Sequence, residues 1–171
     1  MLSDMSEILL QIGKNVTKNI DLNSLSNKTI LITGSSGLIG INLVASLRAL
    51  CEQGKGPKLV ICAVNSKVKD FDNSIFNFPQ ASVVSGDLSN GIDFLRDYGN
   101  FDYIIHTAGY GQPGKFMADP VKTLKLNTST TIQLFELLNE SGNFLFLSTS
   151  EVYSGLEFSP HKETDIGTTN T

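Results

Sequence analysis

Residues 28–40 read Lys-Thr-Ile-Leu-Ile-Thr-Gly-Ser-Ser-Gly-Leu-Ile-Gly, and residues 38–50 after them have the apolar spacing of a helix. A short β-branched strand therefore runs into a turn with three glycines, Gly34, Gly37 and Gly40. The first glycine permits a tight turn, the second lets a phosphate approach the backbone, and the third lets the helix pack closely on the strand. Strand, glycine turn and helix in this order predict a site for a dinucleotide pyrophosphate, held by the N–H groups that open the helix. The same turn places Ser36, Leu38 and Ile39 among the expected cofactor-binding residues.

The chain beyond residue 50 alternates between strand and helix patterns. Continuous apolar runs predict strands over 58–64, 81–85, 101–106 and 143–147, and helices are expected over 91–98 and 121–139. Strands that are apolar on both faces, with helices between them, pair in parallel. The sequence therefore predicts an α/β fold, a Rossmann-type doubly wound parallel sheet with helices on both faces. We divide the chain into an N-terminal helical extension, residues 1–27, and a dinucleotide-binding domain, residues 28–171.

The N-terminal extension carries a helical stripe of apolar residues at intervals of three and four: Leu2, Met5, Leu9, Ile12, Val16 and Ile20. This stripe predicts a helix that packs on the domain or on a partner subunit. The alternative is an interfacial membrane anchor, which the small number of cations, Lys14 and Lys18, disfavours. Acidic residues where a signal peptide needs bases exclude a secretory leader.

Composition excludes several other classes. The 171 residues carry 13 Lys and Arg against 17 Asp and Glu, a net charge of −4, so the basic footprint of a nucleic-acid binder is missing. No apolar run is long enough to cross a membrane. Cys51 and Cys62 form neither a disulfide framework nor a zinc spacing, and no metal site is expected. Two free thiols in apolar stretches indicate a reducing, cytoplasmic compartment.

The glycine turn resembles the T-G-x-x-G-x-x-G signature of the extended short-chain dehydrogenase/reductases, which include nucleotide-sugar epimerases, dehydratases and decarboxylases. Further motifs follow in the family's order: Ser85-Gly86-Asp87-Leu88, His106-Thr107-Ala108-Gly109, and Asp119-Pro120-Val121 leading to Asn127. The resemblance implies that Asp87 contacts the adenine amino group and that Leu88 packs on the ring. It also implies that Thr107, Ala108 and Gly109 lie along the dinucleotide and that Asn127 supports the site. We assign His106 no chemistry, because a core histidine is the commoner case.

The stretch Leu147-Ser-Thr-Ser-Glu-Val-Tyr153 is the most specific of these motifs. Its Thr-Ser-Glu-Val-Tyr pattern is similar to that of the UDP-glucuronate decarboxylases, whereas 4,6-dehydratases usually carry Thr-Asp-Glu and 4-epimerases usually lack the acid. Ser154 before Gly155 departs from the family, where Gly follows Tyr directly. The resemblance implies transient oxidation at C4 of a nucleotide sugar, with Thr149 and Ser150 bonding the sugar and Glu151 acting near C5 and C6. A 4-epimerase, a 4,6-dehydratase and a non-catalytic dinucleotide-binding module remain the alternatives.

The family's catalytic Tyr-x-x-x-Lys motif is not found in these residues, because none of the four tyrosines is followed by lysine four positions later. We expect that motif, and the substrate domain, beyond residue 171, and we expect the chain alone to bind dinucleotide weakly without turnover. The expected cofactor is NAD, with NADP possible, because Asn65 ends the second strand where an acid often binds the ribose, and Lys67 follows it. The expected partners are a nucleotide-sugar substrate and a second copy in a homodimer, with no nucleic acid and no membrane.

Overall fold

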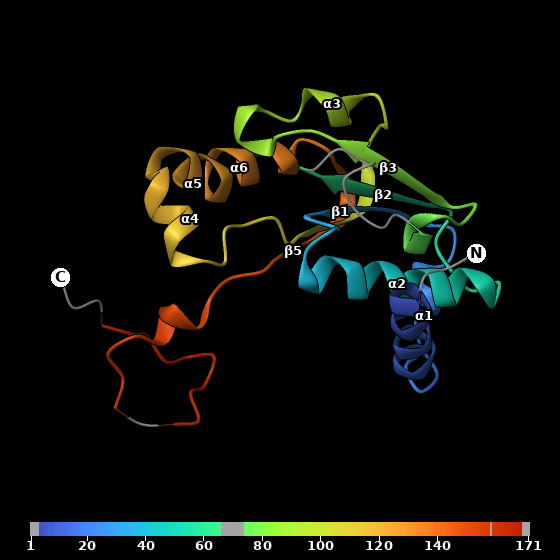
Figure 1. The fold of residues 1–171 in the computed structure, drawn as a ribbon, viewed down its shortest axis with the longest axis horizontal. Coiled ribbons are helices and arrows are strands. Elements are labelled where there is room, and N and C mark those ends of the chain that lie inside the picture. The colour runs from blue at the N-terminus through green and yellow to red at the C-terminus, as the bar shows by residue number, and fades with distance from the viewer. Residues whose placement is uncertain (1–3, 66–73, 158, 169–171) are drawn as a thin grey trace.

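The computed structural model describes residues 4–65, 74–157 and 159–168. Its five strands form a single parallel sheet in the order β3-β2-β1-β4-β5 (Figure 1). They are β1 (Thr29–Thr33), β2 (Leu59–Val64), β3 (Ala81–Ser85), β4 (Phe101–His106) and β5 (Leu138–Phe146). The chain begins in the middle of the sheet, builds outward to β3 and returns beside β1. This arrangement confirms the predicted Rossmann-type doubly wound sheet.

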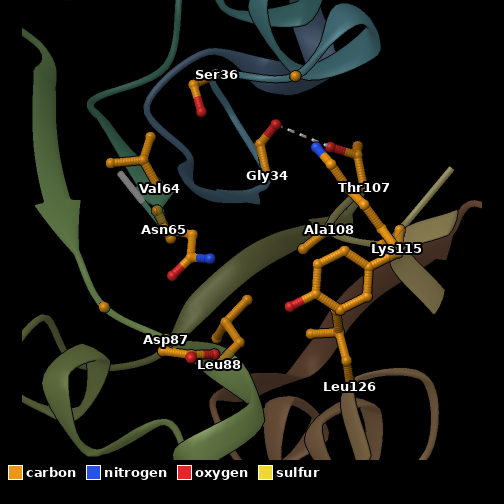
Figure 2. A pocket seen from close by; sticks show the side chains of 15 residues that line it. Gly34, Ser36, Val64, Asn65, Asp87, Leu88, Thr107, Ala108, Lys115 and Leu126 are labelled. Carbon is orange, nitrogen blue, oxygen red and sulfur yellow. Dashed lines mark hydrogen bonds between the residues drawn. The ribbon is translucent and has the colours of Figure 1, made fainter. Parts of the chain in front are cut away.

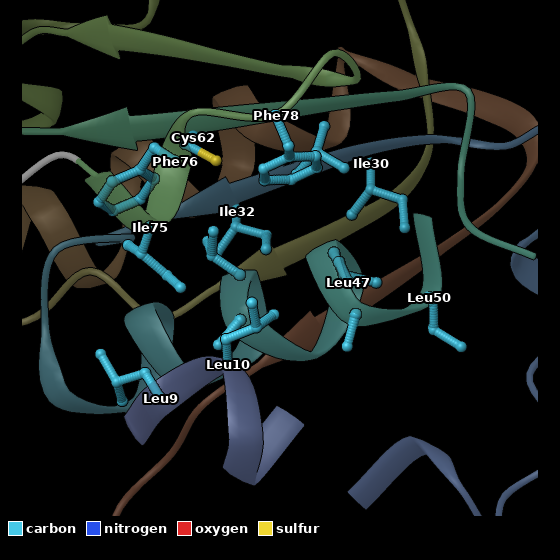
Figure 3. Close-up of a cluster of buried hydrophobic side chains, with 14 residues drawn as sticks. Leu9, Leu10, Ile30, Ile32, Leu47, Leu50, Cys62, Ile75, Phe76 and Phe78 are labelled. Atoms are coloured by element: carbon cyan, nitrogen blue, oxygen red, sulfur yellow. The ribbon is translucent and has the colours of Figure 1, made fainter. Parts of the chain in front are cut away.

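Helices cover both faces of the sheet, and each face has its own apolar cluster. On one face, α1 (Asp4–Thr17), α2 (Leu38–Glu52) and the 3₁₀ turn η3 (Ser74–Phe76) pack on Ile30, Ile32 and Cys62, as Figure 3 shows. On the other, α3 (Asp93–Arg96), α5 (Pro120–Asn127), α6 (Ser129–Phe135) and η4 (Leu88–Asn90) pack on Leu31 and Ile61. Successive side chains of a strand point to opposite faces, which is why neighbouring residues of β1 serve different clusters.

The connection between β4 and α5 contains α4 (Pro113–Ala118), a helix that the sequence patterns did not predict. It buries none of its residues and begins with proline in its first turn, so it lacks the apolar periodicity on which the prediction depends. The other 3₁₀ turns of the described residues are η1 (Asn23–Leu25) and η5 (Ser150–Tyr153). Over residues 4–65, 74–157 and 159–168, no helix has both the length and the apolarity of a membrane span.

The predicted N-terminal helix exists and packs on the domain, but not through the apolar stripe from which it was predicted. Leu9 is buried as expected, whereas Met5, Ile12, Val16 and Ile20 are exposed; Leu2 lies outside the described residues. The face that contacts α2 instead contains Ser6, Leu9, Leu10, Gly13 and Thr17. Small residues occupy it because the two helices approach closely: a Cβ at position 13 would lie 2.6 Å from the Ala45 carbonyl oxygen.

The single helix predicted over 121–139 is also wrong. Two helices, α5 and α6, meet at Thr128, whose φ of −123° and ψ of −76° are not helical. The Thr128 hydroxyl donates to the Leu124 carbonyl over 2.7 Å, a bond of the kind that bends helices. The fifth strand begins at Leu138 rather than residue 143, because Leu138 pairs with Phe101 across the sheet. Leu138, at the end of the predicted helix, therefore belongs to a strand.

Candidate dinucleotide site

A cleft of about 280 Å³ opens at the carboxyl ends of the strands, where the strand order reverses between β1 and β4. Ligands of open α/β sheets bind at such reversal points. The cleft brings together segments that are far apart in the sequence: the glycine turn, the end of β2, the turn after β3 and the loop after β4, with one residue each from α4 and α5 (Figure 2). Its lining consists of Gly34, Ser36, Gly37, Ala63, Val64, Asn65, Gly86, Asp87, Leu88, Thr107, Ala108, Gly109, Tyr110, Lys115 and Leu126.

The three glycines of the turn meet three different geometric demands. Gly34 has a φ of +69°, and a Cβ there would lie 2.8 Å from the Ala108 backbone. Gly40 does not line the cleft; it packs beneath the turn, where a Cβ would lie 2.7 Å from the Ser35 Cα. Gly37 lines the cleft and caps α2 without a side-chain hydrogen bond to the helix. The opening N–H groups of α2 therefore begin at the rim of the cleft, as a phosphate site requires.

Hydrogen bonds tie the loop after β4 to the glycine turn. The Thr107 hydroxyl donates to the Thr33 carbonyl over 2.6 Å, and the Ala108 N–H donates to the Thr33 hydroxyl over 3.3 Å. The backbone N–H of Leu147, just after β5, donates in turn to the His106 carbonyl over 3.2 Å. The ends of β1, β4 and β5 are thus joined edge to edge.

Asp87 caps η4 and forms an ion pair at the base of the cleft. One carboxylate oxygen accepts from the Ser89 N–H and hydroxyl, and the other lies 2.7 Å from the Lys122 Nζ on α5. Burial raises the pKa of Asp87, but the hydrogen bonds from Lys122 and Ser89 outweigh it and leave the pKa below its usual value. The cleft therefore presents an ionised carboxylate, which can accept a hydrogen bond from an amino group.

Asn65 lies in the cleft at the end of β2, as predicted, and presents an amide to it (Figure 2). Lys67, the residue that left NADP open, lies outside the described residues. An amide can hydrogen-bond a ribose hydroxyl without repelling a phosphate. Asn65 is therefore compatible with the ribose of NAD and with that of NADP.

Some expected cofactor residues do not line the cleft, and some lining residues were not expected. Leu38 and Ile39 leave their side chains 85% and 54% exposed, so only their backbone can serve a phosphate. Asn127 is exposed and does not line the cleft; its Oδ1 lies 3.9 Å from the place of a Cβ on Gly109. The sequence reasoning missed Tyr110 and Lys115, which follow β4 in a stretch without periodicity; their position just after the family-like His-Thr-Ala-Gly motif was the available signal.

Thr149, Ser150 and Glu151 lie outside the lining of this cleft and are exposed. Thr149 caps η5, where its hydroxyl oxygen accepts from the Glu151 N–H over 3.3 Å. Figure 1 shows this segment, in orange-red, leaving the sheet after β5. This segment follows the carboxyl end of β5, which pairs with β4, so it leaves the sheet at the same edge that holds the cleft.

His106 is 1% exposed beneath the cleft, with Nδ1 2.6 Å from the Thr33 hydroxyl oxygen. Burial lowers its pKa, and its ring packs against Phe144 and Phe146. This placement fits a histidine that holds two loops together. Within the described part of the chain, no three His, Cys, Asp or Glu side chains are grouped as a metal site would need.

Comparison with known proteins identifies the family. The profile of the family described as "NAD dependent epimerase/dehydratase family" matches residues 30–171. UDP-glucuronic acid decarboxylase 1 of Danio rerio is 30% identical over 150 residues, which are 87% of this chain and 34% of that protein. The Arabidopsis thaliana enzyme of the same name is 32% identical over 82% of this chain and 31% of its own length. UDP-glucose 4-epimerase of Streptococcus mutans is 31% identical over 79% and 40%.

Solved structures show the same fold. The UDP-N-acetylglucosamine 4-epimerase of Methanobrevibacter ruminantium, in complex with UDP-N-acetylmuramic acid, superposes with a TM-score of 0.65 at 24% identity, over 84% of this chain and 44% of that one. WbmF of Bordetella bronchiseptica, in complex with NAD+ and UDP, gives 0.54 at 24% identity, over 72% and 36%. The chain spans 31–40% of the length of the three curated relatives above.

Proposed function

The chain belongs to the NAD dependent epimerase/dehydratase family, and from this premise we propose that it is the dinucleotide-binding part of an NAD-dependent enzyme that modifies a nucleotide sugar. The observation that carries the proposal is the cleft, which joins a bare glycine turn at a helix start to an ionised Asp87. The two ends of this cleft suit the two ends of an adenosine diphosphate: phosphates at Gly37 and the adenine amino group at Asp87. Bound NAD would supply the hydride acceptor.

The residues of this chain fit such a cofactor on steric grounds. Gly37 leaves the cradle open, and a Cβ there would protrude beside the N–H groups that hold phosphate. Thr107 and Ala108 hold the neighbouring loop through bonds to Thr33, so the site is organised before a ligand arrives. Asn65 would bond the ribose.

For the whole protein, we propose decarboxylation of a UDP-glucuronate-like sugar. The supporting observations are the Thr149-Ser150-Glu151 stretch after β5 and the identity of about a third to two decarboxylases. In this proposal Thr149 and Ser150 hydrogen-bond the sugar near C4, and Glu151 acts near C5 and C6. Residues outside the 171 supply the family's tyrosine and lysine, and the free thiols of Cys51 and Cys62 support a cytoplasmic site of action.

A 4-epimerase is the second candidate, because the Streptococcus mutans epimerase is similarly related. Epimerisation needs no acid at position 151, whereas the proposed decarboxylation does. In the full-length protein, Glu151→Gln should abolish release of CO₂ from UDP-glucuronate. Interconversion of UDP-glucose and UDP-galactose by that variant, without decarboxylation by the parent, would establish the epimerase instead.

Calorimetric titration of this chain tests the cofactor site directly. We expect NAD+ to bind and Gly37→Ala to weaken binding by about tenfold or more, because the added methyl occupies the phosphate cradle. Gly114→Ala is the matched control: it lies in α4 with nothing within 4 Å of its Cβ, so binding should not change. Equal affinity in both variants, or no heat with NAD+ or NADP+, would contradict the proposal.

A further inference from the structure

The outward face of α1 carries an apolar stripe made of Met5, Ile8, Ile12 and Val16. These side chains are 63%, 56%, 44% and 48% exposed. They recur every three or four residues and so form one line along the helix, roughly 16 Å long at 1.5 Å per residue. Contiguous exposed apolar surface of this kind marks an interaction site. The stripe also lies outside residues 30–171, which match the family profile.

The face of α1 that adjoins the stripe is packed on α2, which fixes the direction of the stripe. Leu9 and Leu10 enter the core cluster beside α2 (Figure 3). Gly13 lies against the Ala45 backbone, so no larger side chain fits between the two helices. Lys14 forms an ion pair with Glu52 of α2 over 3.3 Å. The stripe therefore cannot turn inward without breaking these contacts.

Charge along one edge of the stripe is self-complementary. On a helical wheel, Asp4 at the start of α1 and Lys18 just after its end lie on the same side of the apolar line. A second copy laid antiparallel, with Met5 opposite Val16, brings Ile8 to within one residue of the position opposite Ile12. The same register brings Asp4 to within one residue of the position opposite Lys18 at both ends, and a two-fold axis makes the two ends equivalent. We propose that the stripe on α1 binds the α1 stripe of a second copy of this chain, in antiparallel orientation.

The contact is small, which sets its expected strength. Four partly exposed side chains bury roughly 300–400 Å² per copy, less than half of the ~800 Å² per partner of a stable complex. We therefore expect weak self-association, with a dissociation constant on the order of 0.1 mM. The exposed charge pairs add little to the affinity, and their main effect is to determine how the two helices align.

Sedimentation equilibrium over a range of concentrations tests the apolar part of the proposal. Ile12→Gln should weaken association about 30-fold, because a two-fold contact loses the side chain twice. Ile132→Gln is the matched control, since Ile132 is also an isoleucine on a helix, α6, and is 67% exposed. Association that survives Ile12→Gln, or that only Ile132→Gln removes, would overturn the proposal. Binding of anionic phospholipid vesicles that Ile12→Gln abolishes, without self-association, would instead make the stripe a membrane anchor and overturn it too.

Charge reversal tests the antiparallel register. Asp4→Lys and Lys18→Asp should each weaken association roughly fivefold, because each places two like pairs in contact. The double variant restores the pairs with their signs exchanged, and we expect it to return to within about twofold of the parent. An alternative explanation is that these charges act only on the helix dipole. In that case the double variant should associate most weakly of the three. That order, or equal association in all three, would refute the proposed pairing.

Discussion

Asp87 should make the cleft sensitive to a single amino group on its ligand. Its carboxylate accepts two bonds from Ser89 on one oxygen and one from Lys122 on the other. A carboxylate offers about four acceptor positions, so one remains on the oxygen that faces Lys122. An adenine amino group can take that position, whereas hypoxanthine, which carries an oxygen there, cannot donate. We therefore expect nicotinamide hypoxanthine dinucleotide to bind more weakly than NAD+.

The size of this preference follows from the charge of the acceptor. A hydrogen bond to a charged group contributes about 1.5–3 kcal/mol, and each 1.4 kcal/mol is tenfold in affinity. The cleft should then prefer NAD+ over the hypoxanthine form by about 10- to 150-fold. Asp87→Asn keeps an acceptor for Ser89 but turns an amide N–H₂ toward the Lys122 ammonium, so the bond to adenine is lost. In this variant the preference should fall to about twofold or less.

Calorimetric titration of both dinucleotides into the parent and the variant measures the preference as a ratio, so a general loss of affinity cancels. Lys122→Met is the control: it removes the ammonium and leaves the carboxylate, and we expect the preference for NAD+ to persist. A preference of the same size in the parent and in Asp87→Asn would refute the assignment of Asp87 to adenine. No preference in the parent would do the same.

Three further variants test the fold around the site. Gly40→Ala should lower the free energy of unfolding by about 3 kcal/mol or more, because its Cβ meets the Gly34–Ser35 backbone; chemical denaturation measures this, and a change under 1 kcal/mol would contradict it. Asp102 accepts from the Thr29 N–H and hydroxyl over 2.8 and 3.0 Å and pairs with Lys28, bonds that lower its pKa. Asp102→Ala should therefore cost about 2–3 kcal/mol at pH 7, a loss that disappears as the pH falls through the lowered pKa and the parent carboxylate is protonated; an equal loss at pH 7 and at pH 2.5 would argue against it. Burial lowers the pKa of His106, so the unfolded chain binds its proton first and stability should fall as the pH drops below about 6.5. Thermal unfolding of His106→Gln should lack that decline, and an identical pH profile in the variant would rule it out.

The central part of the fold could be predicted because its signals are local. Strand β1, the glycine turn and α2 are contiguous, and each glycine has its own steric reason at Gly34, Gly37 or Gly40. Strands β1 and β2 could be located because they are buried on both faces and read as unbroken apolar runs. The order of the sheet then follows from the reversal that this family of folds shares.

The errors have a common cause, which is that tertiary contacts outweighed the local pattern. The periodicity of the N-terminal helix is carried by Met5, Ile12 and Val16, yet the core selected the face with Gly13 because only small residues allow α2 to come so close. Leu138 reads as the end of a helix but pairs with Phe101 in the sheet. Phe101 lies 37 residues before Leu138, far outside the short stretch over which periodicity is evaluated. A local pattern therefore could not assign Leu138 to the sheet.

The hydroxyl of Thr33 belongs to a buried hydrogen-bond network beneath the cleft, and this network holds the lining residues in place. Its oxygen accepts from the Ala108 N–H and lies 2.6 Å from His106 Nδ1. The Leu126 carbonyl beside Nε2 can only accept, which favours a proton on Nε2 and donation from the Thr33 hydroxyl to Nδ1. Nδ1 then acts as the acceptor and the neutral ring carries its proton on Nε2, which faces the Leu126 carbonyl 3.5 Å away. Burial lowers the pKa of His106, which favours the neutral ring. One hydroxyl and one neutral imidazole thus connect the glycine turn, the loop after β4 and α5, and the lining residues Ala108 and Leu126 are held from below without any charge that a dinucleotide would have to neutralise.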